Sequence, residues 1–264
     1  MRIVKKYPNS LFCWVNLGTS DFEGAKVFYG GLFGWLFEDK PADMGASYTI
    51  ACIDGHSVAG LGSLPPDAEE QGIPTSWSSF VKHDDIEAVA AKITAGGGNI
   101  VMPVTDVMTE GRMLLATDPT GALFGVWEPQ DNIGAQVVNA PNSLLWNELQ
   151  THDVEAAQAF YASVFGWAHE TGEDGYVVVS VDGRMQAGMM ALQEEWGDVP
   201  PHWSVYFLVE DVETAVAKVH ELGGTVLRPP FPVAEMGKMA VVQDPQGGVF
   251  NVMESFFVDT PPGY

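Results

Sequence analysis

The sequence LLWNELQTHDVEAAQAFYASVFGW, residues 144–167, decides how the rest of the chain is interpreted. An earlier stretch, LFCWVNLGTSDFEGAKVFYGGLFGW, residues 11–35, repeats it at a constant offset of 132 (167 minus 35). Trp14 thus matches Trp146, and the acidic residue before the helical pattern is Asp in both copies. Self-similarity at a fixed offset is the signature of a repeated architecture.

Two later segments repeat at a shorter offset. WSSFVKHDDIEAVAAKI, residues 77–93, matches WSVYFLVEDVETAVAKV, residues 203–219, at an offset of 126 (203 minus 77). GRMLLATDPTGALFGVWE, from Gly111, matches GKMAVVQDPQGGVFNVME, from Gly237, at the same offset. The second half therefore lacks six residues between Trp35 and Trp77. The chain is a duplicated domain, with predicted halves at residues 1–132 and 143–264 joined by a linker at 130–142.

Each half contains two units in which a strand is followed by a helix and three strands. Residues 11–18 read as a strand, so Trp14 and Asn16 lie on one face and Cys13 on the other. Ser20 or Asp21 can cap the following helix. These patterns predict an α+β fold of four βαβββ units.

Composition limits the class of protein. Twelve basic residues against 35 acidic ones give a net charge of −23, which repels nucleic acid and anionic membranes and attracts cationic small molecules. No apolar run is long enough to span a membrane, and the first ten residues lack the apolar core of a signal peptide. Two cysteines are too few for a disulfide framework, so a reduced, cytoplasmic setting is expected.

The fourfold recurrence, with FGW after the first helix of each half and DPTG or DPQG in its later turn, resembles the vicinal oxygen chelate superfamily. That superfamily includes glyoxalase I, extradiol dioxygenases and bleomycin-resistance proteins. Within it, the chain is similar to a two-domain branch labelled hydroxylase in antibiotic-producing bacteria. The resemblance covers residues 10–256 and implies two half-open-barrel domains, each with a ligand on its concave face.

Metal-dependent members of the superfamily place His or Glu on inward strands. The resemblance assigns those positions to the following residues here: Trp14 and Trp146, Ser78 and Ser204, Gly125 and Asn251. All six depart from the family pattern, whereas transition metals need several imidazole or carboxylate donors. We therefore expect no metal and no other cofactor.

If the two barrels form, each encloses a cleft. The first cleft offers Trp14, Asn16, Ser78, Phe80 and Gly125, and the second offers Trp146, Glu148, His202, Ser204, Tyr206 and Asn251. The second is more polar, and ligand sites need a few convergent polar groups within an apolar pocket. This favours ligand contacts in residues 143–256. A slip of one residue in strand register would instead turn Trp77 and Trp203 inward.

Within the second cleft we assign candidate roles. Glu148 serves as a general base or hydrogen-bond acceptor, with His202 and Tyr206 as polar catalytic partners. Trp146 stacks on a planar or cationic ligand, and Ser204 and Asn251 contact it. Trp14 and Asn16 are the corresponding ligand-binding candidates in the first cleft. A structural role for Glu148, as a hydrogen-bond anchor to the backbone or to a tyrosine, remains an alternative.

Three functions remain open from the sequence. The first is a metal-independent protein that binds or transforms a planar or carbonyl-containing small molecule. The second is a binding protein that sequesters a cationic drug or metabolite. The third is a divergent metal-dependent glyoxalase or dioxygenase using Glu148 and His202. The sequence predicts a small-molecule partner and no nucleic-acid or membrane partner.

Overall fold

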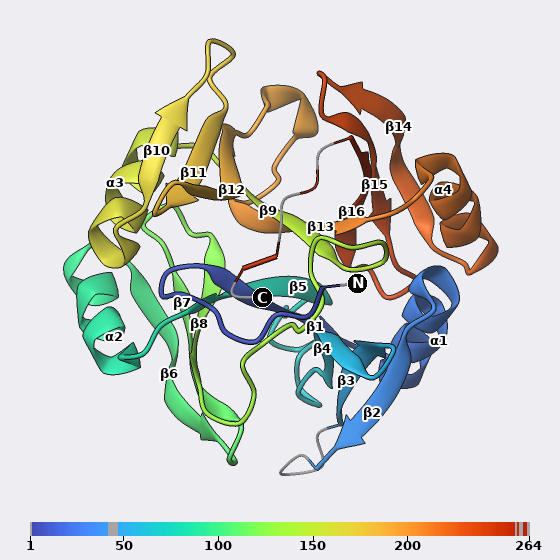
Figure 1. The fold of residues 1–264 in the computed structure, drawn as a ribbon, viewed down its shortest axis with the longest axis horizontal. Coiled ribbons are helices and arrows are strands. Elements are labelled where there is room, and N and C mark those ends of the chain that lie inside the picture. The colour runs from blue at the N-terminus through green and yellow to red at the C-terminus, as the bar shows by residue number, and fades with distance from the viewer. Residues whose placement is uncertain (1, 42–46, 257, 259–260, 263–264) are drawn as a thin grey trace.

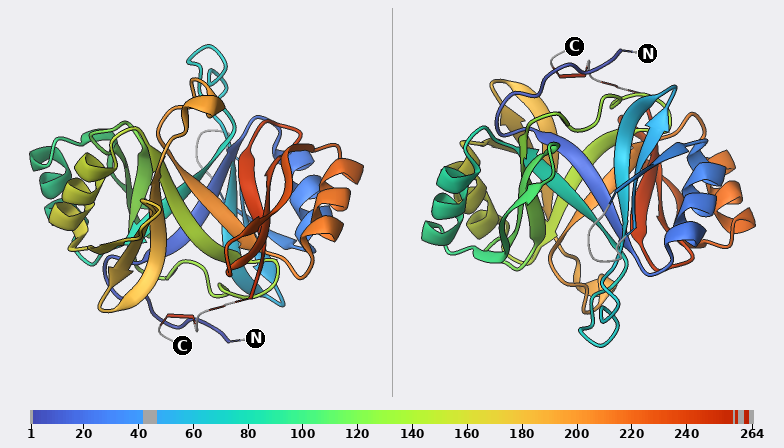
Figure 2. Two further views of the ribbon diagram at one scale, coloured as in Figure 1. Left: turned by 90° about the horizontal axis from the view of Figure 1, so that it is seen from above. Right: turned by 90° about the horizontal axis from the view of Figure 1, so that it is seen from below.

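The computed structural model describes residues 2–41, 47–256, 258 and 261–262. These residues form two eight-stranded sheets with helices along the outside (Figure 1). Helices α1 and α4 lie together at one side of the molecule and α2 and α3 at the other, as the views in Figure 2 also show. Each helix pair thus joins one helix from each half of the chain.

The first half follows the predicted order of elements. It comprises β1 (Phe12–Thr19), α1 (Phe22–Phe33), β2 (Leu36–Lys40), β3 (Tyr48–Ile53), β4 (His56–Ser63), β5 (Ser76–Lys82), α2 (Ile86–Ala95), β6 (Asn99–Val107), β7 (Gly111–Thr117) and β8 (Leu123–Pro129). β6 continues from Asn99 to Val107. It does so through Pro103, which an edge strand tolerates because one side needs no backbone donor.

The second half repeats this order. It comprises β9 (Leu144–Thr151), α3 (Val154–Phe165), β10 (Ala168–Thr171), β11 (Val177–Val181), β12 (Arg184–Ala191), a short 3₁₀ helix η1 (Glu194–Trp196), β13 (His202–Leu208), α4 (Val212–Glu221), β14 (Thr225–Val233), β15 (Gly237–Gln243) and β16 (Val249–Ser255).

The two sheets have the same topology. Their strand orders are β2-β3-β4-β1-β5-β8-β7-β6 and β10-β11-β12-β9-β13-β16-β15-β14, which confirms the duplication. Neither sheet closes into a full barrel. Most of the missing residues lie in one hairpin, since Tyr48 follows Trp35 by 13 positions and Tyr176 follows Trp167 by nine (48 minus 35 and 176 minus 167).

Local chemistry sets the ends of the four long helices. In each, an aspartate side chain accepts a hydrogen bond from the backbone N–H three residues later, as Asp21 does from Gly24 at 3.0 Å. Asp21, rather than Ser20, is therefore the cap of α1. Helices α1 and α3 both end at a glycine in the left-handed conformation, Gly34 and Gly166, where other residues would be strained.

The hydrophobic core joins the halves instead of separating them. One cluster of buried residues combines the first unit of the chain with the fourth, so that Phe28 and Phe33 of α1 pack against Phe250 of β16. A second cluster combines the second unit with the third, as Phe124 packs on Phe160. Each sheet belongs to one half, but each core is built from both.

The strand register agrees with the sequence prediction. Trp14 pairs with Phe80 and Asn16 with Ser78, so these four share the concave face of β1 and β5. In the second sheet, Glu148 pairs with Ser204 in the same way. Trp77 and Trp203 point to the opposite side, toward the helices, where each donates a hydrogen bond to a tyrosine of α1 or α3.

Candidate functional site

The first half contains a cavity of about 340 Å³ on the concave face of its sheet. Its inner wall is mainly aromatic, with Trp14 from β1, Phe80 from β5 and Trp127 from β8. The charged side chains at its lining are Lys40, Asp106 and Glu110. A volume of this size lies within the range of small-molecule pockets, and an apolar interior with few polar groups is their usual chemistry.

Tyr48 is the main polar group inside this cavity. It begins β3 and lies over Gly60, where a Cβ atom would collide with the Tyr48 hydroxyl. The Asn16 carboxamide oxygen approaches the same point, because Asn16 pairs with Gly60 across the sheet. Gly60 therefore creates the space in which a hydroxyl and a carboxamide meet at the cavity wall.

Burial raises the pKa of Tyr48 to about 12, and the nearby Glu110 carboxylate acts in the same direction. A hydrogen bond with Trp14 opposes this rise. Tyr48 is therefore a neutral hydroxyl at physiological pH. Its proton is available to a carbonyl oxygen, of Asn16 or of a ligand.

A second glycine widens the same cavity. Gly125 of β8 pairs with Phe80 of β5, and a Cβ at Gly125 would overlap the Phe80 ring. The corresponding pair in the second half is Asn251 and Tyr206. Because Gly125 has no side chain, the Phe80 ring can occupy the position directly over it. The space above the Phe80 ring then belongs to the cavity.

The second half is organised around a buried carboxylate. Glu148 is 6% exposed and accepts hydrogen bonds from the hydroxyl of Tyr206 at 2.7 Å and from that of Tyr176 at 2.9 Å. Gln150 donates its side-chain N–H to the same carboxylate at 3.0 Å. The Trp146 indole N–H donates to the Tyr176 hydroxyl at 3.1 Å. We call these five residues the Glu148 cluster.

The tyrosines of the Glu148 cluster are held in their protonated form. Burial raises the pKa of Tyr176 and of Tyr206 far above the ordinary value, and the Glu148 charge adds to the rise in both. Each tyrosine therefore remains a donor to Glu148. The carboxylate needs no ligand to satisfy its acceptors, because three protein donors already do so.

Apolar side chains pack beside this cluster. Tyr206, Met239 and Met253 form a small buried core, against which Trp146 and Phe231 pack. Phe231 stands where the first half has Thr105 (231 minus 126), and the Arg228 guanidinium lies 3.6 Å from the centre of its ring. The second half thus carries a larger side chain at this position than the first, and that side chain packs against the small buried core.

The other sequence candidates are distributed unevenly. Asn251 donates to Ser204 at 3.3 Å, and both are buried on the floor of the second cleft. His202 lies opposite Gln150 at the end of β13, and its Nδ1 is 2.8 Å from the Pro200 carbonyl oxygen. The structure therefore brings Glu148, Tyr206 and Trp146 together, whereas His202 lies at the first position of β13 and contacts the Pro200 carbonyl.

Sequence reasoning missed the two tyrosines that contact these clefts. Tyr48 and Tyr176 occupy equivalent positions, each over a glycine that pairs with Asn16 or Glu148. A Cβ at Gly188 would collide with the Tyr176 hydroxyl, as one at Gly60 would with Tyr48. A glycine in the middle of a strand often marks such a close approach and was the available signal.

The donor set does not fit the metal that the superfamily resemblance implies. The six ligand positions carry Trp14, Trp146, Ser78, Ser204, Gly125 and Asn251, so they offer neither imidazole nor carboxylate. Glu148 is the acidic group that faces the second cleft from β9, and its oxygens are engaged by the two tyrosines and Gln150.

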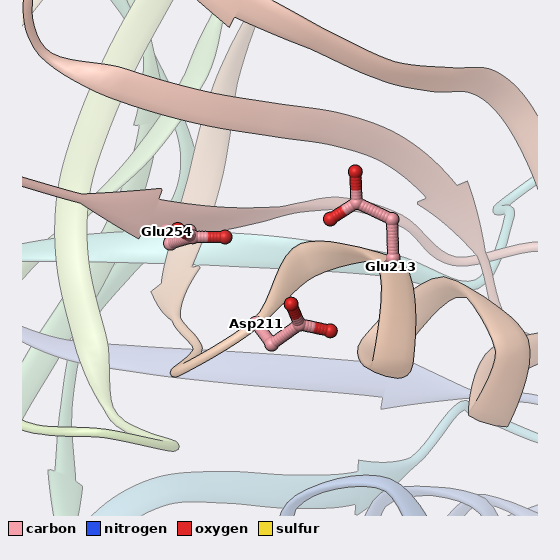
Figure 3. A group of neighbouring side chains, drawn as sticks. All are labelled: Asp211, Glu213 and Glu254. Carbon is pink, nitrogen blue, oxygen red and sulfur yellow. The ribbon is translucent and has the colours of Figure 1, made fainter.

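Among the described residues, one group of acidic side chains has the spacing of a metal site. Asp211, Glu213 and Glu254 converge near the start of α4 (Figure 3). Asp211 caps the helix, and Lys238 pairs with Glu213 at 2.6 Å. These contacts show that the three carboxylates stabilise the N-terminal end of α4.

The first half repeats this arrangement. Asp85 caps α2, and Arg112 pairs with Glu87 and, at 3.3 Å, with Glu128. A carboxylate at the helix start is favourable in both halves because the N-terminal end of a helix is positive. The acidic group of Figure 3 therefore belongs to the repeated scaffold.

Comparison with known families identifies the chain. Residues 12–126 match the model of the glyoxalase/bleomycin resistance protein/dioxygenase superfamily, and residues 147–253 match that of a glyoxalase-like domain. The chain belongs to this superfamily. None of the described helices combines the length and the apolar character that crossing a membrane requires.

Curated relatives match over nearly the whole chain. "Putative glyoxylase CFP32" of Mycobacterium tuberculosis is 39% identical over 246 residues, covering 91% of this chain and 93% of that protein. "Anthracycline biosynthesis protein DnrV" of Streptomyces peucetius is 34% identical over 255 residues, covering 91% of this chain and 92% of that protein.

Solved structures share the fold at low identity. The Mn(II)-bound glyoxalase from Novosphingobium aromaticivorans has a TM-score of 0.65 at 15% identity, with 95% of this chain and 83% of that chain covered. The 2,3-dioxygenase LapB from Pseudomonas sp. KL28 has a TM-score of 0.67 at 16% identity, with 97% and 96% covered.

Proposed function

We propose that the protein binds a planar small molecule in the cavity of its first half. The observation that carries this proposal is the aromatic cavity of about 340 Å³ lined by Trp14, Phe80 and Trp127. Aromatic side chains present large apolar faces on which a flat ring system can stack. The cavity lies on the concave side of the sheet, and residues of β3 and of the end of β6 also line it.

The polar groups of the cavity favour a ligand that carries a carbonyl or hydroxyl group. The Tyr48 hydroxyl can donate, and the Asn16 carboxamide can both donate and accept. Both stand on one wall, beside Gly60. A flat molecule stacked on the aromatic wall would direct its oxygen toward this pair. The name of the anthracycline biosynthesis relative, which refers to planar polycyclic carbonyl compounds, supports this ligand class.

A second candidate site is the Glu148 cluster. A carboxylate held between two tyrosines is an arrangement suited to proton transfer, and this observation favours an enzymatic role in the second cleft, as the sequence suggested. Proton abstraction would require the ligand to displace Tyr176 or Tyr206 from Glu148. Binding in the first cavity requires no such displacement, so we rank it first.

The duplication supplies a matched test of the two sites. Dihydroxyanthraquinone, a planar three-ring dione, serves as the probe, and quenching of tryptophan fluorescence reports its binding. Tyr48→Phe removes one hydroxyl in the first cavity, and Tyr176→Phe removes the equivalent hydroxyl in the second cleft. We expect Tyr48→Phe to weaken binding by about two- to tenfold, as the loss of one hydrogen bond does. We expect Tyr176→Phe to leave the affinity unchanged.

Three outcomes separate the proposals. A loss of affinity confined to Tyr48→Phe supports the first cavity. A loss confined to Tyr176→Phe supports the Glu148 cluster as the site. Absence of saturable binding to the folded wild-type protein contradicts the proposed ligand class. A parallel assay for consumption of the probe distinguishes binding from turnover.

A further inference from the structure

One row of side chains crosses β6, β7 and β8 on the concave face of the first sheet. Thr105 pairs with Met113, and Met113 pairs with Trp127, so the three side chains share one face. Met113 and Trp127 line the cavity of about 340 Å³. In the first half, this row therefore forms part of a cavity wall.

The equivalent row of the second half carries an aromatic ring. Phe231 pairs with Met239, and Met239 pairs with Met253, across β14, β15 and β16. Phe231 packs against the small core that these two methionines form with Tyr206. Met239 is accordingly 7% exposed, whereas its counterpart Met113 is only half-buried. The Phe231 ring thus covers the row that borders the cavity in the first half.

Two further contacts fix the place of this ring. The Arg228 guanidinium lies 3.6 Å from the ring centre, a cation–π contact that stabilises the ring in this position. Trp146 packs against the same small core as Phe231. Because Tyr206 and Trp146 belong to the Glu148 cluster, the Phe231 ring and that cluster contact one common core.

The strand that carries Phe231 makes few backbone hydrogen bonds at this point. β14 is the last strand in the order of its sheet, so one of its sides has no partner strand (Figure 1). The register shifts between Arg228 and Phe231, and Pro229, Pro230 and Pro232 have no N–H to donate. Moving the ring out of the cleft therefore breaks few backbone hydrogen bonds, which is the property of a segment that opens locally.

We propose that the second cleft is a binding site for a single aromatic ring, and that the chain's own Phe231 occupies it. The place already has the shape of such a ring, with the polarisable side chains of Met239 and Met253 as its wall and a guanidinium to contact the ring face. A ligand ring that replaces Phe231 would lie against the core that Tyr206 shares with the Glu148 cluster.

This inference goes beyond the proposed function, because it concerns the other half of the chain. The described lining of the first cavity lies within residues 14–134. The inference therefore holds whichever ligand the first cavity takes, and its test does not depend on that ligand.

The test removes the ring and supplies a substitute. Phe231→Ala deletes the ring, and Phe231→Thr introduces the residue that the first half has at this position. The control, Phe22→Ala, deletes another half-buried ring with a cation near it, since the Lys26 Nζ lies 5.2 Å from the Phe22 ring centre. The probe is 4-fluorotoluene, which has the shape of the phenylalanine side chain. Fluorine NMR measures its dissociation constant, and circular dichroism verifies that each variant is folded.

We expect both Phe231 variants to bind the probe saturably, about tenfold or more tightly than wild type, because Phe231 fills the site in most wild-type molecules. Phe22→Ala should bind no more tightly than wild type. Should Phe231→Ala not fold, Phe231→Thr carries the test, because the matching strand β6 accepts threonine at this position. Folded Phe231 variants with no gain over wild type, or an equal gain in Phe22→Ala, would overturn the proposal.

Discussion

The hydroxyl of Tyr29 donates to the carboxylate of Asp244 at 2.8 Å, across 215 positions of the chain. Its counterpart in the other half, Tyr161, donates to Asp118 at 3.1 Å. Each tyrosine lies on the first helix of one half, and each aspartate lies in the DPTG or DPQG turn of the other half. The duplicated halves are therefore joined by two buried, reciprocal hydrogen bonds.

Loss of one of these bonds should weaken the whole fold. Tyr161→Phe leaves the Asp118 oxygen and the Trp203 indole without their buried partner, because Trp203 donates to the Tyr161 hydroxyl at 2.8 Å. We expect the free energy of unfolding to fall by about 1–3 kcal/mol, measured by urea denaturation. An unchanged midpoint and slope would show that the contact contributes nothing. Tyr29→Phe, the equivalent substitution, should behave alike.

The interlocked cores predict that half of the chain cannot fold as an isolated monomer. A fragment of residues 143–264 exposes the faces of α3 and of β16 that pack on the other half. We expect it to aggregate or to form a homodimer in which two copies supply both cores. Sedimentation and denaturation at several concentrations test this. A monomer that unfolds cooperatively, independent of concentration, would contradict it.

Alkaline pH should unfold the protein in a manner coupled to tyrosine ionisation. All six tyrosines in the described residues have raised pKa values, owing first to burial: Tyr7, Tyr29, Tyr48, Tyr161, Tyr176 and Tyr206. The folded state therefore holds these protons more tightly than the unfolded chain, whose tyrosines ionise near pH 10. Their stabilising contribution is complete below about pH 10 and is lost as pH rises through the folded-state values.

Each such tyrosine lowers the free energy of unfolding by up to about 1.4 kcal/mol per pH unit above its unfolded pKa. Tyrosinate absorbance and circular dichroism should therefore change together in a single steep transition above pH 10. Substantial tyrosinate absorbance in a chain that still shows its native circular dichroism would contradict the burial of these hydroxyls.

Glu148→Gln should affect stability more than binding. The amide keeps the shape of the side chain, but one of its two acceptor positions becomes a donor facing Tyr176 or Tyr206. We expect a loss of about 1–3 kcal/mol in unfolding free energy, with the affinity for dihydroxyanthraquinone unchanged. Asn16→Ala should do the reverse and weaken binding. If Glu148→Gln abolished binding in a protein that remained folded, the second cleft would be the site.

Much of the fold could be predicted because the duplication tests each pattern twice. The Asp21 and Asp153 caps, the glycine helix ends and the shared face of Trp14 and Asn16 are local properties of the sequence. The exchange of core contacts between the halves could not be predicted in this way. It depends on how Tyr29 meets Asp244, a contact for which sequence spacing carries no signal.

Which of the two clefts can bind a ligand depends on which side chains in each cleft contact one another. The sequence placed Glu148 and Tyr206 on one concave face, and the structure brings them within hydrogen-bond distance. What sequence could not reveal is that Tyr176, from a hairpin, completes the arrangement and satisfies the carboxylate. Glu148 and Tyr206, which the sequence suggested as ligand contacts, thus hydrogen-bond to each other. The less polar first cleft contains the cavity of about 340 Å³.

The most direct test of the central claim is a crystal structure of the protein with bound dihydroxyanthraquinone. If the first cavity is the site, electron density for the rings lies against Trp14, Phe80 and Trp127, with an oxygen within hydrogen-bond distance of Tyr48 or Asn16. Density against Trp146 and Tyr206, with Glu148 released from its tyrosines and the first cavity empty, would contradict it.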